Sequence, residues 1–251
     1  MSKLNNKVAV ITGGNSGIGY AAAVELAAQG ASVVITGRNE EATASAAAEL
    51  GVVGITSDQA NLESIDLLVA EVKERFGKVD IIFLNAGTAN FAPFDQASEE
   101  HFDSIINVNL KGVFFTLQRF LPLLNDGASV IFNTSINANI GMPNSSVYSA
   151  SKGALLSLNR VLSTELAPRK IRVNAISPGP VQTPVYEKLG LTEEELAGFG
   201  EVLSKKILLQ RFGQPHEIAK VVTFLASSDS AFITGTEIVV DGGLTVDSVM
   251  N

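Results

Sequence analysis

Four polar residues in otherwise apolar surroundings have side chains suited to proton transfer: Asn109, Ser135, Tyr148 and Lys152. Tyr148 and Lys152 are four positions apart, so on a helix they share one face and the ammonium group lies near the phenol. A phenol with a pKa of about 10 is a poor acid or base near neutral pH, but a nearby positive charge favours the phenolate and lowers that pKa. With a hydrogen bond from Ser135, the phenol could exchange a proton with a hydroxyl or carbonyl group. On its own, the tyrosine–lysine pair could equally be a solvated helix face.

A strand, a glycine-rich turn and a helix open the chain. Residues 7–11 have the composition of a buried parallel strand, and the alanine-rich residues 20–29 have that of a helix. Between them the sequence reads Thr12-Gly13-Gly14-Asn15-Ser16-Gly17-Ile18-Gly19. This layout aims backbone N–H groups and a positive helix end at a phosphate, and the glycines let the backbone approach it closely. The spacing G-x-x-x-G-x-G departs from the dinucleotide fingerprint G-x-G-x-x-G, so an ordinary strand-to-helix loop is the alternative.

Strand-like and helix-like stretches alternate along the whole chain. The sequence predicts strands at residues 8–11, 32–36, 51–56, 81–85, 129–134, 172–177 and 237–240. It predicts helices at residues 20–29, 40–50, 61–76, 99–125, 147–167 and 215–226. Such alternation indicates a doubly wound parallel sheet with helices on both faces, and no linker or repeat divides it. We therefore expect one α/β domain over residues 1–251, with ligands bound where the carboxyl ends of the strands meet.

Six motifs follow one another in the order and spacing of the short-chain dehydrogenase/reductase family, which the chain resembles from about Lys3 to Thr245. They are residues 12–19, Asn85-Ala86-Gly87, Asn107-Val108-Asn109, Ser135, Tyr148-x-x-x-Lys152 and Pro178-Gly179. The resemblance implies a Rossmann fold and an oxidoreductase that transfers a hydride between a nicotinamide cofactor and a ketone or secondary alcohol.

The resemblance also implies a role for each polar residue. Tyr148 would be the acid in ketone reduction and the base in alcohol oxidation. Lys152 would lower the pKa of the phenol and bind the nicotinamide ribose, and Ser135 would orient the substrate oxygen and stabilise the developing alkoxide. Asn109 would hold a water that links Lys152 to solvent, unless it is a helix-breaking residue that bonds to backbone.

The cofactor-binding residues implied by the resemblance span the chain. Asp58 would accept a hydrogen bond from the adenine amino group, although Gln59 replaces the commoner aliphatic neighbour. Residues 178–183 would seat the carboxamide end of the nicotinamide. The full set is Gly13, Asn15, Ser16, Gly17, Ile18, Gly19, Arg38, Asp58, Asn85, Ala86, Gly87, Tyr148, Lys152, Pro178, Gly179, Val181 and Thr183.

The end of the second predicted strand favours NADP(H) over NAD(H). An acid there would bind the ribose hydroxyls of NAD, but this chain has Gly37 followed by Arg38. A guanidinium group suits a 2′-phosphate because its planar fork donates two hydrogen bonds. NAD(H) stays open, since Arg38 could stack on the adenine of either cofactor and Asn15-Ser16 stand where many NADP-binding relatives have a second basic residue.

Composition excludes several other classes of protein. The 251 residues contain no cysteine, so disulfides and thiolate chemistry are excluded and a reducing compartment is compatible. A formal charge of −8 argues against a nucleic-acid or anionic-membrane partner. No signal peptide or membrane span is evident, so we expect a cytoplasmic protein. His101 and His216 are far apart and have no thiol beside them, so we expect no metal site.

The substrate is less well specified by the sequence. Residues 184–210 form the variable flap over the active site in this family. An apolar pocket could be lined by Asn137, Met142, Val185, Tyr186 and Leu189, together with Ile140 and Phe199, although each could equally serve in packing.

Three functions compete. The first is a carbonyl reductase or alcohol dehydrogenase for small to medium, mainly neutral ketones. The second is a 3-oxoacyl-carrier-protein reductase, which needs basic residues near its entrance because carrier proteins are acidic. Residues 123–128 hold an acid and no base, but Arg169 and Lys170 keep this alternative open. The third, a non-catalytic NADP-binding sensor, would have no need of the four polar residues.

Apolar residues surround much of the two longest predicted helices, 99–125 and 147–167, and exceed what one sheet-facing stripe needs. A closed symmetric oligomer is the usual way to bury a second face. Family members commonly pair these two helices across a two-fold axis, and residues 234–243 resemble a second contact, so we expect a homotetramer, with a dimer as the fallback.

Overall fold

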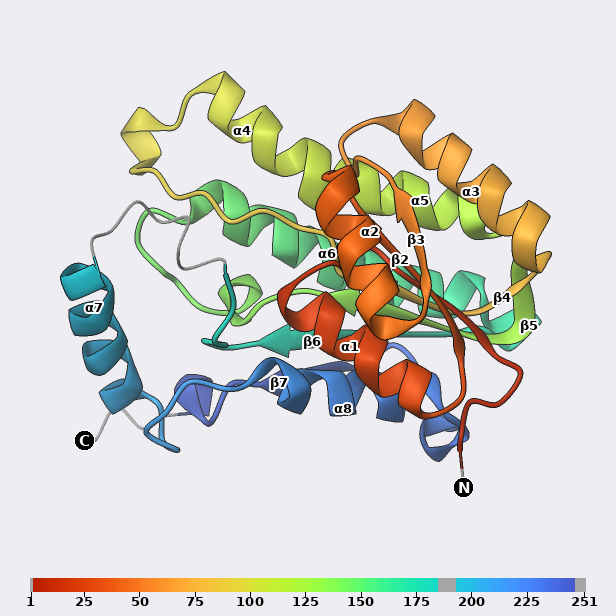
Figure 1. The fold of residues 1–251 in the computed structure, drawn as a ribbon. Coiled ribbons are helices and arrows are strands. Elements are labelled where there is room, and N and C mark those ends of the chain that lie inside the picture. The colour runs from red at the N-terminus through yellow and green to blue at the C-terminus, as the bar shows by residue number, and fades with distance from the viewer. Residues whose placement is uncertain (1, 185–192, 247–251) are drawn as a thin grey trace.

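Seven parallel strands form one sheet in the order β3-β2-β1-β4-β5-β6-β7, as Figure 1 shows. The structure is a computed structural model, and it describes residues 2–184 and 193–246. The strands are β1 Val8–Ile11, β2 Ser32–Gly37, β3 Val53–Thr56, β4 Val79–Leu84, β5 Leu124–Asn133, β6 Arg172–Pro178 and β7 Glu237–Val240. The α-helices in these ranges are α1 Gly17–Ala28, α2 Glu40–Leu50, α3 Leu62–Phe76, α4 Glu99–Ile106, α5 Val113–Phe120, α6 Ser146–Glu165, α7 Glu193–Lys206 and α8 Pro215–Ala226.

Helices cover both faces of the sheet. Successive residues of a strand point to opposite faces, so an apolar strand places side chains in the core on each side. On β1, Val10 faces a core cluster that includes residues of α3, α5 and α6. Its neighbours Ala9 and Ile11 face a second cluster with residues of α1, α2 and α8. The expected single α/β domain is therefore confirmed, and the buried apolar strands of the parallel sheet follow from having both faces covered.

The long helix predicted at residues 99–125 is continuous only as far as Phe120, and its middle is not α-helical. The chain forms α4, then a π-helical stretch Asn107–Gly112, then α5, which ends at Phe120. A Cβ on Gly112 would lie 1.9 Å from the carbonyl oxygen of Gln59, so the helix backbone presses against the loop after β3. Pro122 has no N–H with which to continue the helix, and β5 begins at Leu124.

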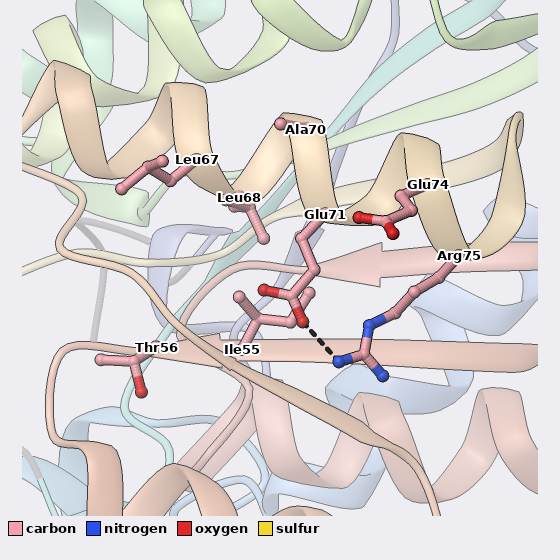
Figure 2. Close-up of a pocket in the computed structure, with 8 residues that line it drawn as sticks. All are labelled: Ile55, Thr56, Leu67, Leu68, Ala70, Glu71, Glu74 and Arg75. Carbon is pink, nitrogen blue, oxygen red and sulfur yellow. Dashed lines mark ion pairs between the residues drawn. The ribbon is translucent and has the colours of Figure 1, made fainter.

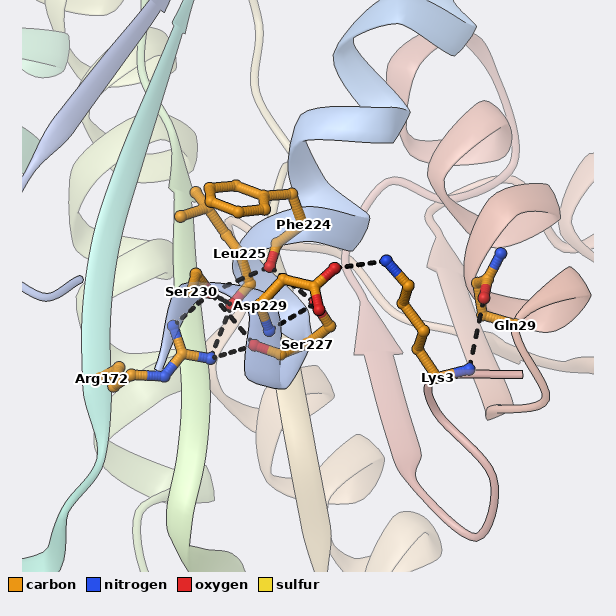
Figure 3. Close-up of polar contacts among 8 residues, drawn as sticks. All are labelled: Lys3, Gln29, Arg172, Phe224, Leu225, Ser227, Asp229 and Ser230. Carbon is orange, nitrogen blue, oxygen red and sulfur yellow. Dashed lines mark hydrogen bonds and ion pairs between the residues drawn. The ribbon is translucent and has the colours of Figure 1, made fainter. Parts of the chain in front are cut away.

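Hydrogen bonds hold the amino end of β6 against the end of α8, and an ion pair joins the loop after α8 to the N-terminal segment, as Figure 3 shows. Arg172 donates to the Leu225 carbonyl at 2.7 Å, the Ser227 carbonyl at 3.2 Å and the Ser230 hydroxyl at 2.9 Å. A guanidinium group at this place satisfies carbonyls that the last turn of α8 leaves free and complements the helix dipole. Lys3 forms an ion pair with Asp229 on the loop that follows α8.

No helix within residues 2–184 and 193–246 combines the length and the apolar character needed to cross a membrane.

Candidate active site

Strand ends bring the predicted site residues to one edge of the sheet. The glycine-rich turn (residues 12–19) follows β1, Arg38 follows β2 and Asn85 follows β4. Ser135 stands two residues beyond β5, and Gly179 follows β6. Because the strands are parallel, these segments share the edge where ligands bind in open α/β sheets.

The glycine-rich turn has the backbone geometry of an anion-binding loop. Gly13 and Gly17 have positive φ angles of 63° and 55°, which glycine adopts without strain. A Cβ on Gly19 would lie 2.2 Å from the Gly13 carbonyl oxygen, so only glycine fits there. Ser16 caps α1 by position, but its side chain makes no capping hydrogen bond. Ile18 packs against the core, so the turn offers the ligand backbone N–H groups and the positive end of a 12-residue helix.

Asn85 fixes this turn to the sheet. Its Nδ2 donates to the Thr12 and Gly13 carbonyls at 3.0 and 2.9 Å. The backbone N–H groups of Asn85 and Ala86 both donate to the Thr12 hydroxyl at 3.0 Å. Asn85 therefore leaves the strand ladder, and β4 ends at Leu84 rather than at residue 85.

Asn133, which the sequence reasoning missed, links the turn to the predicted catalytic lysine. Its Nδ2 donates to Asn85 Oδ1 at 2.8 Å, and its carbonyl accepts from Lys152 Nζ at 2.8 Å. Asn133 is the last residue of β5, two positions before Ser135. The sequence did hold a signal for Asn133: it is a polar residue at the end of an apolar strand, just before a candidate catalytic serine.

Tyr148 and Lys152 lie close together on α6. Lys152 Nζ is 5.7 Å from the centre of the Tyr148 ring. A Cβ on Gly87 would lie 3.5 Å from the same nitrogen, so the segment after β4 also reaches the lysine. Lys152 is buried, and its ammonium group reaches the edge of the sheet on which the glycine-rich turn lies.

Burial dominates the acid–base properties of both groups. It raises the pKa of the Tyr148 phenol, and a hydrogen bond with Ser135 opposes that rise without cancelling it. Burial also lowers the pKa of Lys152 from 10.5 to about 8. The pKa of Tyr148 therefore shifts in the direction opposite to that expected from a tyrosine–lysine pair alone. Removing the phenolate from water destabilises it more than the neighbouring groups stabilise it.

The Asn109 side chain bonds mainly to backbone. It lies in the π-helical stretch, where its Oδ1 accepts from the Thr88 N–H at 2.8 Å and its Nδ2 donates to the Thr88 carbonyl at 2.9 Å. The same Nδ2 is 3.2 Å from the hydroxyl of Ser151, which in turn donates to the Tyr148 carbonyl at 2.7 Å. Asn109 therefore holds the segment after β4 against α6, and a water relay at this residue stays a prediction.

Ser135 is buried on a turn that is fixed on several sides. Its hydroxyl oxygen accepts from the Asn137 N–H at 3.2 Å. The preceding Thr134 donates to the Ile176 carbonyl at 2.8 Å and lies 2.5 Å from the Ser177 hydroxyl. Since a backbone N–H already occupies one lone pair of Ser135, its own proton is left to donate to another oxygen.

The end of β2 leaves Arg38 exposed. Among the described residues Arg38 forms no ion pair or hydrogen bond. A Cβ on the preceding Gly37 would lie 2.5 Å from the Thr43 hydroxyl and 2.9 Å from the Asn15 side chain. Glycine at position 37 thus allows close packing, and an acid there would have to displace Asn15 and Thr43.

Asp58 and Gln59 point their polar groups to different places. Asp58 is exposed, and its Oδ1 accepts from the Ala60 N–H at 2.9 Å. Gln59 is buried, and its Nε2 donates to the Thr116 hydroxyl of α5 at 2.8 Å. The unusual glutamine therefore has a packing role, and Asp58 keeps its second carboxylate oxygen for a ligand.

The segment after β6 returns to the glycine-rich turn. Pro178 pairs with Val240 on β7, and the Gly179 N–H donates to the Val240 carbonyl at 3.0 Å. Buried Val181 forms a bridge with Gly213. Thr183 Cγ2 would lie 3.3 Å from a Cβ on Gly17, so this segment and the turn lie side by side. Of the predicted pocket residues, Val185, Tyr186 and Leu189 fall outside the described residues.

Two loops meet beside Tyr148. Phe91 packs its ring against Tyr148 with centroids 5.8 Å apart and planes at 74°. The Ala92 N–H donates to the Asn144 carbonyl at 2.9 Å, which joins the loop after β4 to the loop before α6. Phe91 therefore lies against the predicted catalytic tyrosine, and the sequence analysis had not placed it in the site.

The sequence model described as Enoyl-(Acyl carrier protein) reductase matches residues 13–245, which is nearly the whole chain. The chain belongs to the short-chain dehydrogenase/reductase family. The resemblance inferred from the six motifs is thereby confirmed, and the chain is an oxidoreductase of this family.

Similar oxidoreductases align with almost the whole length of this chain. An uncharacterized oxidoreductase of Methylorubrum extorquens is 40% identical over 97% of this chain and 100% of its own length. The 3-oxoacyl-[acyl-carrier-protein] reductase FabG of Thermotoga maritima is 36% identical over the same shares. The crystal structure of a Brucella melitensis short-chain dehydrogenase/reductase, described as SDR:Glucose/ribitol dehydrogenase, superposes with a TM-score of 0.91 at 36% identity, covering 96% of this chain and 98% of that one.

Figure 2 shows an open hollow that is no part of the dehydrogenase/reductase site. It lies between α3 and the edge strand β3, and the ion pair between Glu71 and Arg75 is part of its lining. None of the predicted catalytic or cofactor-binding residues lines it. The lining residues are Ile55, Thr56, Leu67, Leu68, Ala70, Glu71, Glu74 and Arg75. In the part of the chain that the structure describes, no three His, Cys, Asp or Glu side chains gather as metal ligands would.

Proposed function

We propose that this protein is a carbonyl reductase or alcohol dehydrogenase that transfers a hydride between NADP(H) and a ketone or secondary alcohol. The observation that carries the proposal is the meeting of Ser135, Tyr148 and Lys152 beside the glycine-rich turn. A proton donor, a hydroxyl that can bind a developing alkoxide and a buried cation are the groups that carbonyl reduction requires.

The residues present fit a nicotinamide dinucleotide. The glycine-rich turn presents uncapped N–H groups of α1 for the pyrophosphate, and Asp58 offers a free carboxylate oxygen for the adenine. Lys152 is available to the ribose through the N–H groups that it does not use on Asn133. Pro178, Gly179, Val181 and Thr183 are proposed to seat the nicotinamide. When bound, the dinucleotide supplies or accepts the hydride.

The raised pKa of Tyr148 favours ketone reduction at neutral pH. A phenol with a raised pKa stays protonated, and the protonated form is the one that can give a proton to the oxygen of the reduced carbonyl. Ser135 donates its free proton to the same oxygen and holds it within reach of Tyr148. Alcohol oxidation needs the phenolate, so we infer that this direction gains rate as the pH rises.

The exposed and unpaired Arg38 supports NADP(H). Within the described ranges no carboxylate neutralises its guanidinium group, which is the state expected of a phosphate-binding arginine in the free protein. Asn15 lies beside Gly37 at the same strand end and adds a polar neutral group.

A 3-oxoacyl-carrier-protein reductase is the second candidate, because a relative at 36% identity carries that name. Arg169 does not support it. This side chain is bonded to Asp126 at 2.9 Å and to the Leu121 carbonyl at 2.9 Å, at the amino end of β5. Ser135 lies beyond the other end of that 10-residue strand, so Arg169 and the adjacent Lys170 are far from the site entrance. A non-catalytic sensor is disfavoured because all four proton-relay residues are present.

We also propose that residues 184–210 act as a substrate flap, and that the protein is a cytoplasmic homotetramer. The apolar side chains of Phe102, Phe114 and Val161 are 48%, 41% and 49% exposed on α4, α5 and α6. Their exposure leaves an apolar face that a second copy would cover.

Steady-state assays test the proposed function. Purified protein should reduce neutral ketones with NADPH, with a kcat/KM for NADPH above that for NADH, and should act poorly on acyl thioesters. Reduction of a 3-oxoacyl thioester in strong preference to every free ketone would favour the second candidate. No turnover of any carbonyl or alcohol with either cofactor would contradict both.

A further inference from the structure

Asn137 is a buried amide next to the catalytic hydroxyl. It lies on the 3₁₀ turn Ile136–Ala138 that follows Ser135, and the residue is 7% exposed. Its backbone N–H donates to Ser135 Oγ at 3.2 Å. Its side chain is therefore anchored within a few ångströms of the oxygen that would bind a substrate carbonyl.

The amide group of Asn137 is poorly satisfied. Its Nδ2 contacts Met142 Sδ at 3.3 Å, and a thioether is a weak acceptor. Among residues 2–184 and 193–246, Asn137 Oδ1 has no hydrogen-bond partner. This oxygen is not one of the polar side-chain atoms that are completely buried, so a ligand can reach it. The amide therefore has hydrogen-bonding capacity left over, because its oxygen is reachable and its nitrogen has only a weak acceptor, and a ligand could use that capacity.

Met142 is a partner that a ligand could displace. Its carbonyl is held by the Ser145 hydroxyl at 2.6 Å, so the backbone of the loop is fixed. Its side chain is unbranched and flexible, and the residue is 39% exposed. The sulfur therefore occupies a position that an oxygen acceptor could take once the methionine side chain swings aside.

The spacing of the two groups limits the ligand. Covalent geometry keeps an asparagine amide within about 5 Å of its own backbone nitrogen, which is 3.2 Å from Ser135 Oγ, so the amide lies at most about 8 Å from that hydroxyl. Hydrogen bonds of about 2.8 Å from both groups can therefore reach two oxygens on neighbouring carbon atoms of one small substrate.

We propose that Asn137 binds a second oxygen of the substrate, on the carbon next to the reacting carbonyl, so that the preferred substrates are α-hydroxy ketones and the matching 1,2-diols. The proposal rests on the proposed ketone reduction and adds a substrate class to it. A site built around a buried amide discriminates against an analogue that lacks the matching oxygen, because the amide is then left unpaired.

Three ketones of similar shape test the proposal: cyclohexanone, 2-hydroxycyclohexanone and 4-hydroxycyclohexanone, each with NADPH. The parent protein should show a kcat/KM about 10- to 100-fold higher for the 2-hydroxy ketone than for the other two. Asn137→Leu, which keeps the branched shape of the side chain and removes its hydrogen bonds, should abolish that preference and leave the kcat/KM for cyclohexanone within about threefold. Asn137→Ala should do the same and serves if the leucine variant does not fold.

Asn139 supplies the matched control. It is an exposed amide just after the same turn and binds Glu237 at 2.6 Å, so Asn139→Ala should leave the ratio between the ketones unchanged. An active parent without preference for the 2-hydroxy ketone would overturn the inference alone. Equal decreases in kcat/KM for all three ketones in the Asn137 variants would also overturn the inference, because such decreases would indicate that Asn137 shapes the turn. A parent inactive on every ketone would overturn the proposed function and this inference together.

Discussion

The protonation states of Tyr148 and Lys152 are set by burial more than by each other. Their pKa values shift toward the neutral form of each group, upward for the phenol and downward for the amine. The cofactor-free protein therefore holds an uncharged phenol, and a lysine whose charge is expensive to keep.

This cost gives Lys152 a measurable effect on stability. Its folded pKa of about 8 lies below the unfolded value of 10.5, so between these limits the unfolded chain binds more protons and stability rises with pH. Relative to Lys152→Met, the cofactor-free parent should gain about 2 kcal/mol of unfolding free energy between pH 7 and pH 9.5. Urea unfolding of both proteins at the two pH values measures this gain. A difference that does not change with pH would contradict the assigned burial.

Arg38 should govern the choice of cofactor. Arg38→Leu is expected to raise the KM for NADPH about 10- to 100-fold through loss of charge-assisted hydrogen bonds and to leave the KM for NADH within about twofold. This single change is cleaner than one that adds an acid at Gly37, because a side chain there would collide with Thr43 and Asn15. Arg75→Leu, in a surface ion pair with Glu71, is the matched control. A parent that already uses NADH better than NADPH would contradict this account of Arg38.

Among the elements, β6 is held at its amino end by Arg172. Arg172→Met should lower the unfolding free energy by about 1–3 kcal/mol, because the carbonyls of Leu225 and Ser227 lose a charged donor and keep only neutral donors. The activity of the folded fraction should persist, since Arg172 begins β6 whereas the site lies beyond its other end. Urea unfolding beside Arg75→Met, whose surface pair contributes little, measures the effect. A decrease in unfolding free energy no larger than that of Arg75→Met would show that the hydrogen bonds of Arg172 are dispensable for stability.

The strands and most helices could be predicted from the sequence because their patterns are local. Apolar runs gave all seven strands, and glycine spacing gave the turn that precedes α1. The π-helical stretch at residues 107–112 was not predicted, and the nearby close approach of Gly112 to Gln59 joins segments that are far apart in the sequence. The role of Asn133 was missed for the same reason, since its partners Asn85 and Lys152 are 48 and 19 residues away.

The predicted catalytic residues come together as the motifs indicated, but their electrostatics could not be predicted. A four-residue spacing predicts that a lysine lies near a tyrosine and says nothing of how dry their surroundings are. The surroundings of Ser135 and Tyr148 were also only partly foreseen: Asn137 and Met142, two predicted pocket residues, contact each other, whereas the contact of Phe91 with Tyr148 required the folded loop after β4.

For the molecule as a whole, the exposed apolar side chains of α4, α5 and α6 predict assembly. Light scattering should give a particle of four times 26.4 kDa. Phe114→Glu combined with Val161→Glu should reduce that mass by at least half, because a buried interface cannot accept unpaired carboxylates. Leu67→Glu on α3, at a side chain that is 68% exposed, is the control and should leave the mass unchanged. A 26 kDa particle for the parent at micromolar concentration would contradict the proposed assembly.

The proton transfer assigned to Tyr148 is the central claim, and Tyr148→Phe tests it most directly. Single-turnover and steady-state ketone reduction should fall by about 10²- to 10⁴-fold, because the phenol is the group proposed to donate the proton. NADPH affinity by calorimetry should stay within about twofold of the parent, and Tyr20→Phe, at a partly buried tyrosine on α1, should leave both quantities unchanged. Turnover by Tyr148→Phe within tenfold of the parent would contradict the account.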